Sequence, residues 1–350
     1  MNPFASLILP PLSAIYSVVI RVRATGYRRG WFSVSELPAP VISIGNLTTG
    51  GTGKTPLVEW VCLAVARETG KRPCVLTRGY GRVNPQSQVL VSDGSKVLAG
   101  EREAGDEAYL LAQNLLGIAA VVSNPNRLAA GEWAIKNMGS EVFVLDDGFQ
   151  HQNLARDLDI VTIDATNPWG GGGLLPYGRL REPRAGLARA DCVVITRTEQ
   201  VDDIDSLMNS VQRLVGEVPI FSSRMVASPV RRLSGESVDN ESLRAQPIAA
   251  FCGVGNPESF FNQLRRAGYT PALTRAFADH NDYNQSDVDR LISEAKAHGA
   301  GALITTAKDA LKLTSLNLEL PCYVLEIKIA IAHEDRLIEM IRNACTNDGR

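Results

Sequence analysis

The sequence lacks the cysteine and histidine spacing of a small metal site. Its six cysteines stand at least twelve positions apart, and no Cys-x-x-Cys pair occurs. Five of the six lie in or beside apolar runs, which predicts buried, reduced thiols. The four histidines show no paired spacing, so we expect no dedicated zinc site.

An excess of charge of one sign is also missing. Lys and Arg total 36 and Asp and Glu total 38, giving a net charge of −2. A generic nucleic-acid binder would be strongly basic, so no nucleic-acid partner is expected, and no feature predicts an obligate protein partner. With 350 residues, 45% of them hydrophobic, the chain is too long and too apolar to be disordered or a disulfide-rich miniprotein. The length suggests about two domains.

Acidic residues are absent from the first 35 positions, which differ from the rest of the chain. The one long, largely apolar stretch, Phe4–Ile20, is followed at once by Arg21, Arg23, Arg28 and Arg29. These positions contribute +4, so the remainder carries −2 − 4 = −6. A secretory signal would place positive charge before the apolar part, which is the reverse order.

The length of this apolar stretch favours contact with a membrane surface over a span. Its seventeen residues would extend roughly 26 Å as a helix, against about 30 Å for a bilayer core. Pro10 and Pro11 are expected to interrupt a continuous helix. We therefore expect residues 1–35 to lie in the lipid interface, with the arginines at anionic headgroups. Packing of an N-terminal helix on the protein's own core is the alternative.

The rest of the chain alternates between strand-like and helix-like patterns. Apolar runs of strand length occur at Val41–Ile44, Cys74–Leu76, Ala119–Val122, Val142–Leu145, Asp159–Ile163, Cys192–Ile195, Ile248–Phe251, Ala302–Ile304 and Cys322–Ile327. Helical spacing lies between many of them. Short apolar strands separated by helices are typical of α/β proteins with a parallel sheet covered on both faces.

A glycine-rich loop after the first strand carries the strongest local signal. The segment Gly45–Pro56 ends in Gly-Lys-Thr and precedes a helical pattern, as in a Walker A loop, although Thr48 replaces the usual first glycine. Such a loop would bind ATP through its backbone N–H groups and the helix N-terminus. The predicted ATP-binding residues are Thr48, Thr49, Gly50, Gly51, Thr52, Gly53, Lys54 and Thr55. A glycine-rich turn without a ligand is the alternative.

A pair of acidic residues after a buried strand also suits phosphate transfer. Asp146 and Asp147 end the apolar strand 142–145, where a Walker B carboxylate holds Mg²⁺. Asp146, together with the Thr55 hydroxyl, is the first choice of ligand for the metal. Asp147 is a further candidate, which would orient Asp146 or contact the metal's ligands without binding the metal itself. A strand-end turn is the alternative reading.

Candidates for acceptor activation and substrate binding are individually weaker. Asp106 opens a helical pattern and could be a helix cap; His280 lies in a polar cluster and could be structural. Arg78, Arg179 and Arg181 are substrate-phosphate candidates, although loop arginines are common.

Taken together, these motifs resemble the tetraacyldisaccharide 4′-kinase family of the lipid A pathway. The resemblance covers nearly the whole chain and is carried, in order, by Gly45–Pro56, Thr77–Arg82, Gly105–Glu107, Asp146–His151, Leu174–Pro183, Phe251–Pro257, Asp279-His280 and Thr305–Asp309. Two positions depart from the family pattern: Tyr177 stands where a small residue is expected, and Ala307 where an acidic one is common. Neither departure touches the expected chemistry.

The resemblance implies a lipid kinase at the cytoplasmic face of the bacterial inner membrane, peripheral or anchored by its N-terminus. It would move the γ-phosphate of ATP, with Mg²⁺, to the 4′-hydroxyl of a tetraacyl glucosamine disaccharide 1-phosphate, giving lipid IVA. Asp106 would be the base and His280 its partner, with Lys54 stabilising the transferring phosphate.

The resemblance also implies an architecture. Residues 36–153 would form a doubly wound P-loop domain, onto which the tail 336–350 could pack. Residues 154–335 would form a second, smaller α/β domain that closes the cleft, and residues 1–35 the membrane-associating segment.

Two other functions remain to be separated from this one. A P-loop GTPase would recognise guanine with Asn/Thr-Lys-x-Asp, and Thr196–Glu199 differs at both key positions. A structural protein that uses nucleotide for assembly at a membrane would need no acid at position 106. Comparing ATP with GTP, with and without the disaccharide, distinguishes the three.

Overall fold

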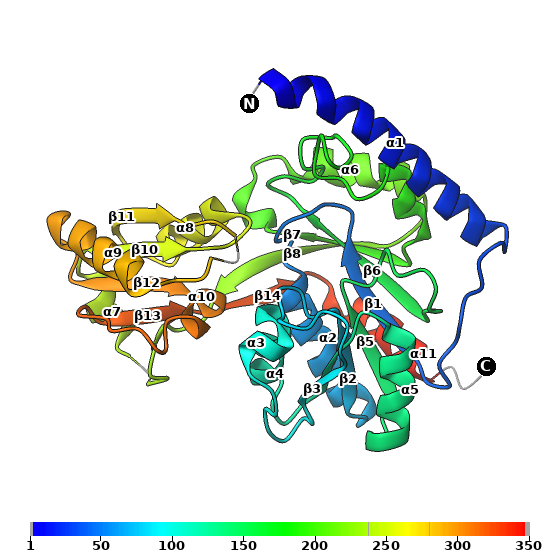
Figure 1. Cartoon of the computed structure of the whole chain (residues 1–350), viewed down its shortest axis with the longest axis horizontal. Helices are drawn as coiled ribbons and strands as arrows, with labels where there is room; N and C mark the ends of the chain where they lie inside the picture. Colours follow the sequence, from blue (N-terminus) through cyan, green and yellow to red (C-terminus); the bar gives the residue numbers. More distant parts are fainter. Residues whose placement is uncertain (1–2, 237, 280, 347–350) are drawn as a thin grey trace. The chain divides into compact units, whose positions relative to one another are not determined.

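The computed structural model describes residues 3–236, 238–279 and 281–346, and it divides into two units (Figure 1). Unit 1 comprises Met1–Arg224 and Ile331–Arg350, and unit 2 comprises Met225–Ala330. The division falls within two strands, β8 (Ile220–Ala227) and β14 (Ile327–Ile331).

Unit 1 is built on a nine-stranded, mainly parallel sheet, which confirms the predicted α/β class. Its order is β14, β8, β7 (Cys192–Thr196), β6 (Leu158–Asp164), β1 (Val41–Asn46), β5 (Val142–Asp146), β2 (Pro73–Thr77), β4 (Ala120–Ser123) and β3 (Val89–Ser92). The pairs from β8 through to β4 are parallel, and β3 joins β4 in the antiparallel sense. The strands β1 and β5 are buried along their whole length, as strands covered on both faces must be.

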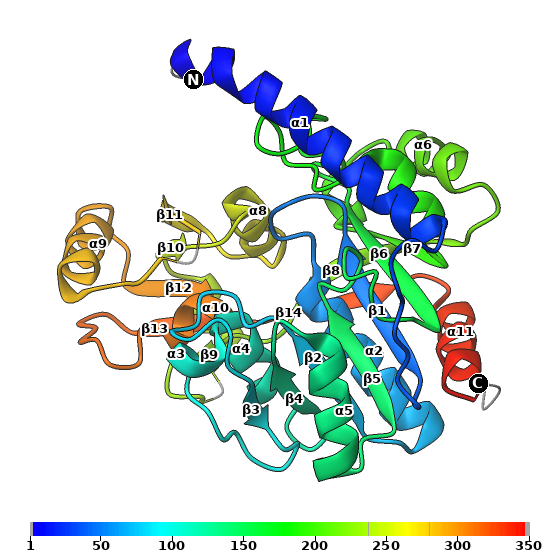
Figure 2. The same ribbon diagram turned by 45° about the vertical axis from the view of Figure 1, so that its right-hand side comes forward.

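Helices cover both faces of this sheet. They are α2 (Lys54–Thr69), α3 (Glu101–Ala104), α4 (Asp106–Asn114), α5 (Arg127–Met138), α6 (Ile204–Val215) and α11 (Glu334–Thr346), with short 3₁₀ turns η1 (Arg184–Arg189) and η2 (Thr198–Gln200). On one face, α5 packs on alternate side chains of β2 and β5, among them Leu76 and Phe143. On the other, α2 contacts β1, β2, β5 and α11 (Figure 2). The C-terminal helix therefore belongs to unit 1.

The predicted domain boundary between residues 153 and 154 falls inside unit 1. The strand β6 follows that point and pairs with β1 in parallel, with Leu158 opposite Ile42. The strands β7 and β8 extend the same sheet outward. The division at residues 224/225 therefore replaces the predicted one, because long-range strand pairing, and not local composition, decides where the sheet ends.

Unit 2 is a smaller α/β unit with its own sheet, in the order β11 (Pro271–Ala276), β10 (Ile248–Cys252), β12 (Ala302–Thr306), β13 (Cys322–Leu325) and β9 (Arg231–Arg232). The first four strands are parallel. Its helices are α7 (Asn240–Arg244), α8 (Pro257–Arg266), α9 (Gln285–Ala297) and α10 (Ala307–Leu311). The buried carboxylate of Asp309 joins three parts of this unit, because it accepts hydrogen bonds from Gly253 N–H, the Tyr283 hydroxyl and the Thr306 hydroxyl.

The N-terminal segment forms one helix, α1 (Pro3–Arg28), on the outside of unit 1 (Figures 1 and 2). The prediction that Pro10 and Pro11 interrupt the helix is wrong, since both lie inside it. Proline removes an N–H donor, but its fixed φ is close to the helical value, so the backbone can stay helical at both positions. Within the described residues, no helix combines the length and apolarity needed to cross a membrane.

The cysteine prediction is confirmed. All six cysteines are free and buried.

Candidate active site

The phosphate loop connects β1 to α2 at the carboxyl end of the sheet. The strand ends at Asn46 and the helix begins at Lys54. Gly50 has φ +112° and Gly53 has φ +80°, conformations that side chains disfavour. A Cβ added at Gly51 would meet no heavy atom within 4 Å, so the protein's own packing does not demand glycine there. An open approach to the backbone is what a bound polyphosphate requires.

Thr48, the departure from the Walker A pattern, has a packing role. Its side chain is buried, and its backbone bridges to Leu180 in the segment 174–183. The next residue, Thr49, donates its N–H to the carbonyl of Arg179 at 2.8 Å. The first residues of the loop therefore contact the segment 174–183. This contact explains why the side chain at position 48 is buried.

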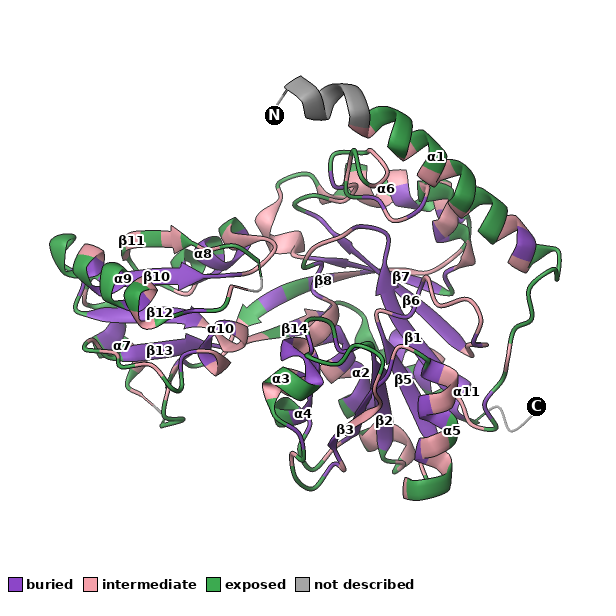
Figure 3. Ribbon diagram, in the orientation of Figure 1, coloured by how far each residue is buried: buried purple, intermediate pink, exposed green. Residues whose placement is uncertain are grey.

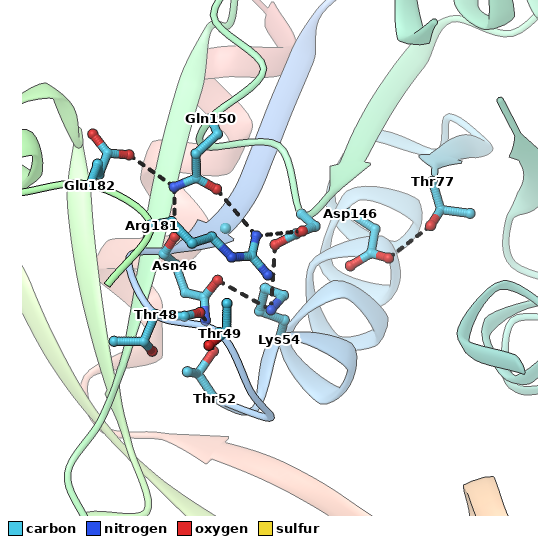
Figure 4. Close-up of polar contacts among 12 residues, drawn as sticks. Asn46, Thr48, Thr49, Thr52, Lys54, Thr77, Asp146, Gln150, Arg181 and Glu182 are labelled. Carbon is cyan, nitrogen blue, oxygen red and sulfur yellow. Dashed lines mark hydrogen bonds and ion pairs between the residues drawn. The ribbon is translucent and has the colours of Figure 1, made fainter. Parts of the chain in front are cut away.

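Lys54 lies in a polar cluster with Asp147 and Arg181; Figure 4 shows Lys54 beside Asn46 and Arg181. Its Nζ is 3.2 Å from Asn46 Oδ1 and 3.4 Å from Asp147 Oδ1, while Arg181 Nη1 is 2.6 Å from Asp147 Oδ2. Burial raises the pKa of Asp147, but the charges of Lys54 and Arg181 outweigh it and hold the pKa well below its usual range. Asp147 is therefore ionised and neutralised by two cations.

Asp146 differs from its neighbour. It is buried and accepts a hydrogen bond from the Thr77 hydroxyl at 2.9 Å. Burial, and then the charges of Glu107 and Asp147, raise the pKa of this carboxyl above its ordinary value. A cation bound nearby would reverse this effect by stabilising the carboxylate.

The oxygen atoms of Asp146 and Thr55 fit Mg²⁺ as ligands. Carboxylate and hydroxyl oxygens are its preferred protein ligands, and it usually takes one or two carboxylates together with phosphate oxygens. Asp146 is the last residue of β5 and Thr55 lies in the first turn of α2, and both elements are neighbours of β1. Within the described ranges, no group of three or more His, Cys, Asp or Glu side chains could hold a metal ion.

Asp106 is the first residue of α4 and is buried. Its Oδ1 accepts the N–H of Glu107 at 2.8 Å. The preceding Gly105 packs against the loop that follows β2, since a Cβ there would lie 2.4 Å from the carbonyl oxygen of Tyr80. Thr77, the last residue of β2 and the one directly before this loop, donates its hydroxyl to Asp146. The loop after β2 therefore connects the carboxylate predicted to be the base with the metal candidate.

The remaining predicted site residues differ in their exposure. Arg78 and Arg179 are exposed, whereas Arg181 is half-buried and already paired with Asp147. His280 lies outside the described residues.

The structure adds residues that the sequence did not single out individually. Gln150 Nε2 donates to the carbonyl of Asn46 and to Glu182 Oε1, both at 2.9 Å, and so joins the phosphate loop to the segment 174–183. Arg127 is buried and donates to the carbonyl of Asp146 at 3.3 Å. Gln150 and Glu182 lie within motifs of the family resemblance, so a signal was present; Arg127 lies in none of them.

Comparisons with known proteins identify the family to which the chain is similar. A family model described as tetraacyldisaccharide-1-P 4′-kinase matches residues 5–346. The tetraacyldisaccharide 4′-kinase of Desulfotalea psychrophila is 36% identical over 341 residues, covering 97% of this chain and 96% of that protein. The protein of the same name from Geobacter metallireducens is 42% identical over 308 residues, covering 87% and 88%.

A solved structure gives the same result for the fold. The "apo" form of LpxK from Aquifex aeolicus in complex with ATP matches with a TM-score of 0.76 and 31% identity, over 96% of this chain and 98% of that one.

Proposed function

This chain belongs to the tetraacyldisaccharide-1-P 4′-kinase family, and we propose that its phosphate loop presents the γ-phosphate of ATP to the 4′-hydroxyl of an acylated glucosamine disaccharide 1-phosphate. It is an ATP-dependent kinase of lipid A biosynthesis. The observation that carries the proposal is the position of Lys54, which ends the phosphate loop 3.4 Å from the Asp147 carboxylate.

The nucleotide is held by residues 48–55. The open backbone at Gly51 admits the phosphates, and Lys54 exchanges its contact with Asp147 for phosphate oxygens. Asp146 and Thr55 would hold Mg²⁺, and Asp147 would orient Asp146 without binding the metal directly. Mg²⁺ neutralises charge on the β- and γ-phosphates when it is bound.

The acceptor is deprotonated by Asp106. Asp106 stands at the N-terminus of α4, and the N–H of Glu107 binds its Oδ1 and orients the carboxylate, the group that would accept the proton. Arg78 and Arg179 are exposed cations that suit the phosphate of the disaccharide. Arg181 is a third candidate, and it already forms an ion pair with Asp147.

The acceptor carries acyl chains, and α1 suits the surface of a bilayer. Its inward side carries polar groups that bind the segment 174–183 of the same unit: the Ser13 hydroxyl donates to Leu174 O at 2.9 Å and the Tyr16 hydroxyl to Arg181 O at 2.7 Å. Its outward side carries the aliphatic side chains Leu12, Ile15, Val18, Val19 and Val22, each between 46% and 62% exposed. Figure 3 shows α1 largely exposed. An apolar side turned outward, with arginines near its end, supports peripheral binding at the anionic cytoplasmic face of the inner membrane.

Exchanging Val18 and Val22 for glutamine tests this arrangement. We expect V18Q/V22Q to weaken binding to vesicles containing anionic lipid by about tenfold, because two apolar side chains no longer enter the interface. Co-sedimentation measures it, with L63Q/L98Q as the matched control, since Leu63 and Leu98 are 50% and 45% exposed elsewhere in unit 1. If V18Q/V22Q and L63Q/L98Q bind vesicles equally well, α1 does not contact the membrane.

Nucleotide turnover distinguishes a kinase from a GTPase switch or a structural protein. We expect rapid ATP consumption only when the acylated disaccharide is added, with one ATP consumed per acceptor phosphorylated. A switch would instead turn over GTP slowly without acceptor, and a structural protein would show no acceptor dependence. Either of those two patterns would contradict the proposed function.

A further inference from the structure

Three carbonyl groups of the phosphate loop accept hydrogen bonds from side chains at the ends of β1 and β7. Asn46 Nδ2 donates to Thr48 O at 2.7 Å, Arg197 Nη1 to Gly51 O at 2.8 Å, and the Thr196 hydroxyl to Thr52 O at 2.9 Å. In a trans peptide, a carbonyl and the following N–H point in opposite directions. The bonds to Gly51 O and Thr52 O therefore direct the N–H groups of Thr52 and Gly53 away from those partners.

Arg197 is held in place from two directions. It follows β7 in the left-handed conformation with φ 58°, which is uncommon for a residue with a side chain. Its Nη1 also donates to Asp164 Oδ2 at the end of β6, and the two side chains are only 12% and 6% exposed. The Arg197 side chain is therefore held in one position, because it is little exposed, has two hydrogen-bond partners and belongs to a residue with a strained backbone.

Arg197 also lies in Thr196–Glu199, the segment of the sequence nearest to the guanine-recognition motif Asn/Thr-Lys-x-Asp, although both key positions differ. Two roles are therefore to be separated. Arg197 could contact the base, or it could shape the loop that holds the phosphates. Its donor is bonded to a carbonyl of the loop itself, and this favours the second role.

We propose that Arg197 is a positioning residue that keeps the phosphate loop in its anion-binding conformation, with Asp164 fixing the guanidinium. This rests on the proposed function, in that the loop binds the phosphates of ATP. The consequence is that Arg197 contributes to the affinity for any polyphosphate, with or without a base.

The test compares ATP with inorganic tripolyphosphate, which has no base. We expect R197A to raise the Kd for both ligands and the KM for ATP by about tenfold, the effect of one hydrogen bond from a charged donor. The kcat should change less than about threefold and the KM for the acceptor should not change. R197K should recover part of the affinity for both ligands. D164N should lower the affinity for both ligands, but less than R197A does.

The control is R275A, because Arg275 forms an ion pair with Glu294 at 3.1 Å in unit 2, away from the loop sequence. Loss of ATP affinity with unchanged tripolyphosphate affinity would place Arg197 at the base and overturn the proposal. A fall in kcat with unchanged KM for ATP would overturn it as well. If R197A does not fold, D164N and R197K carry the same comparison. A wild-type protein that binds both ligands yet phosphorylates no acceptor would contradict the proposed function alone.

Discussion

Replacing Asp106 by alanine is expected to lower kcat for phosphate transfer by about 10²- to 10⁴-fold while the affinity for ATP changes less than about threefold. Asp106 would remove the proton of the acceptor hydroxyl and makes none of the proposed contacts with the nucleotide. Its burial and its bond to the N–H of Glu107 hold the carboxylate in one position. Single-turnover transfer and nucleotide titration measure the two effects separately.

The matched control for Asp106 is Glu103, an exposed acid on the neighbouring helix α3. The variant E103A should transfer phosphate at nearly the wild-type rate. D106N should be as slow as D106A, because an amide keeps the shape of the side chain but cannot accept the proton. Near-full transfer by D106A with unchanged ATP affinity would remove Asp106 from the mechanism.

Replacing Lys54 by alanine is expected to lower kcat/KM for ATP by about 10³-fold or more. The ammonium group of Lys54 is the cation that the phosphate loop brings to the site, 3.4 Å from Asp147 and 3.2 Å from Asn46 Oδ1. Without it, Arg181 still neutralises Asp147, so the site should keep its shape while the transferring phosphate loses a stabilising charge. Steady-state kinetics at varied ATP measure the loss.

Arginine should not substitute for Lys54, because a planar guanidinium cannot take the place of a compact ammonium group at the end of the loop. K136A is the control, since Lys136 is an exposed lysine of α5 in the same unit. If K54A keeps more than about a tenth of wild-type kcat/KM, Lys54 does not stabilise the transferring phosphate.

Local sequence patterns predicted the elements that carry the site. All nine predicted strand segments correspond to strands, and the glycine-rich loop lies between β1 and α2 as expected. Asp146 ends β5, the parallel neighbour of β1. These features depend on residues close together in the chain, where apolar runs, glycine and Gly-Lys-Thr have direct conformational meaning.

Contacts between distant segments could not be predicted in the same way. The pairing of Arg181 with Asp147 joins residues that lie 34 positions apart, and the bond from Arg197 to Gly51 spans 146. Both depend on which strands become neighbours in the sheet. The domain boundary was misplaced for the same reason, because nothing near residue 153 indicates that β6 will pair with β1. The continuous helix through Pro10 and Pro11 shows the opposite error, in which a local rule was given too much weight.

The most direct test of the account is the destination of the terminal phosphate. The purified protein is incubated with ATP labelled at the γ-phosphate, Mg²⁺ and the tetraacyl disaccharide 1-phosphate, and the labelled lipid is then analysed by mass spectrometry and NMR. The account predicts one label per disaccharide, on the 4′-oxygen, with ADP formed in equal amount. Label that appears only as inorganic phosphate, or at any other oxygen of the lipid, would contradict it.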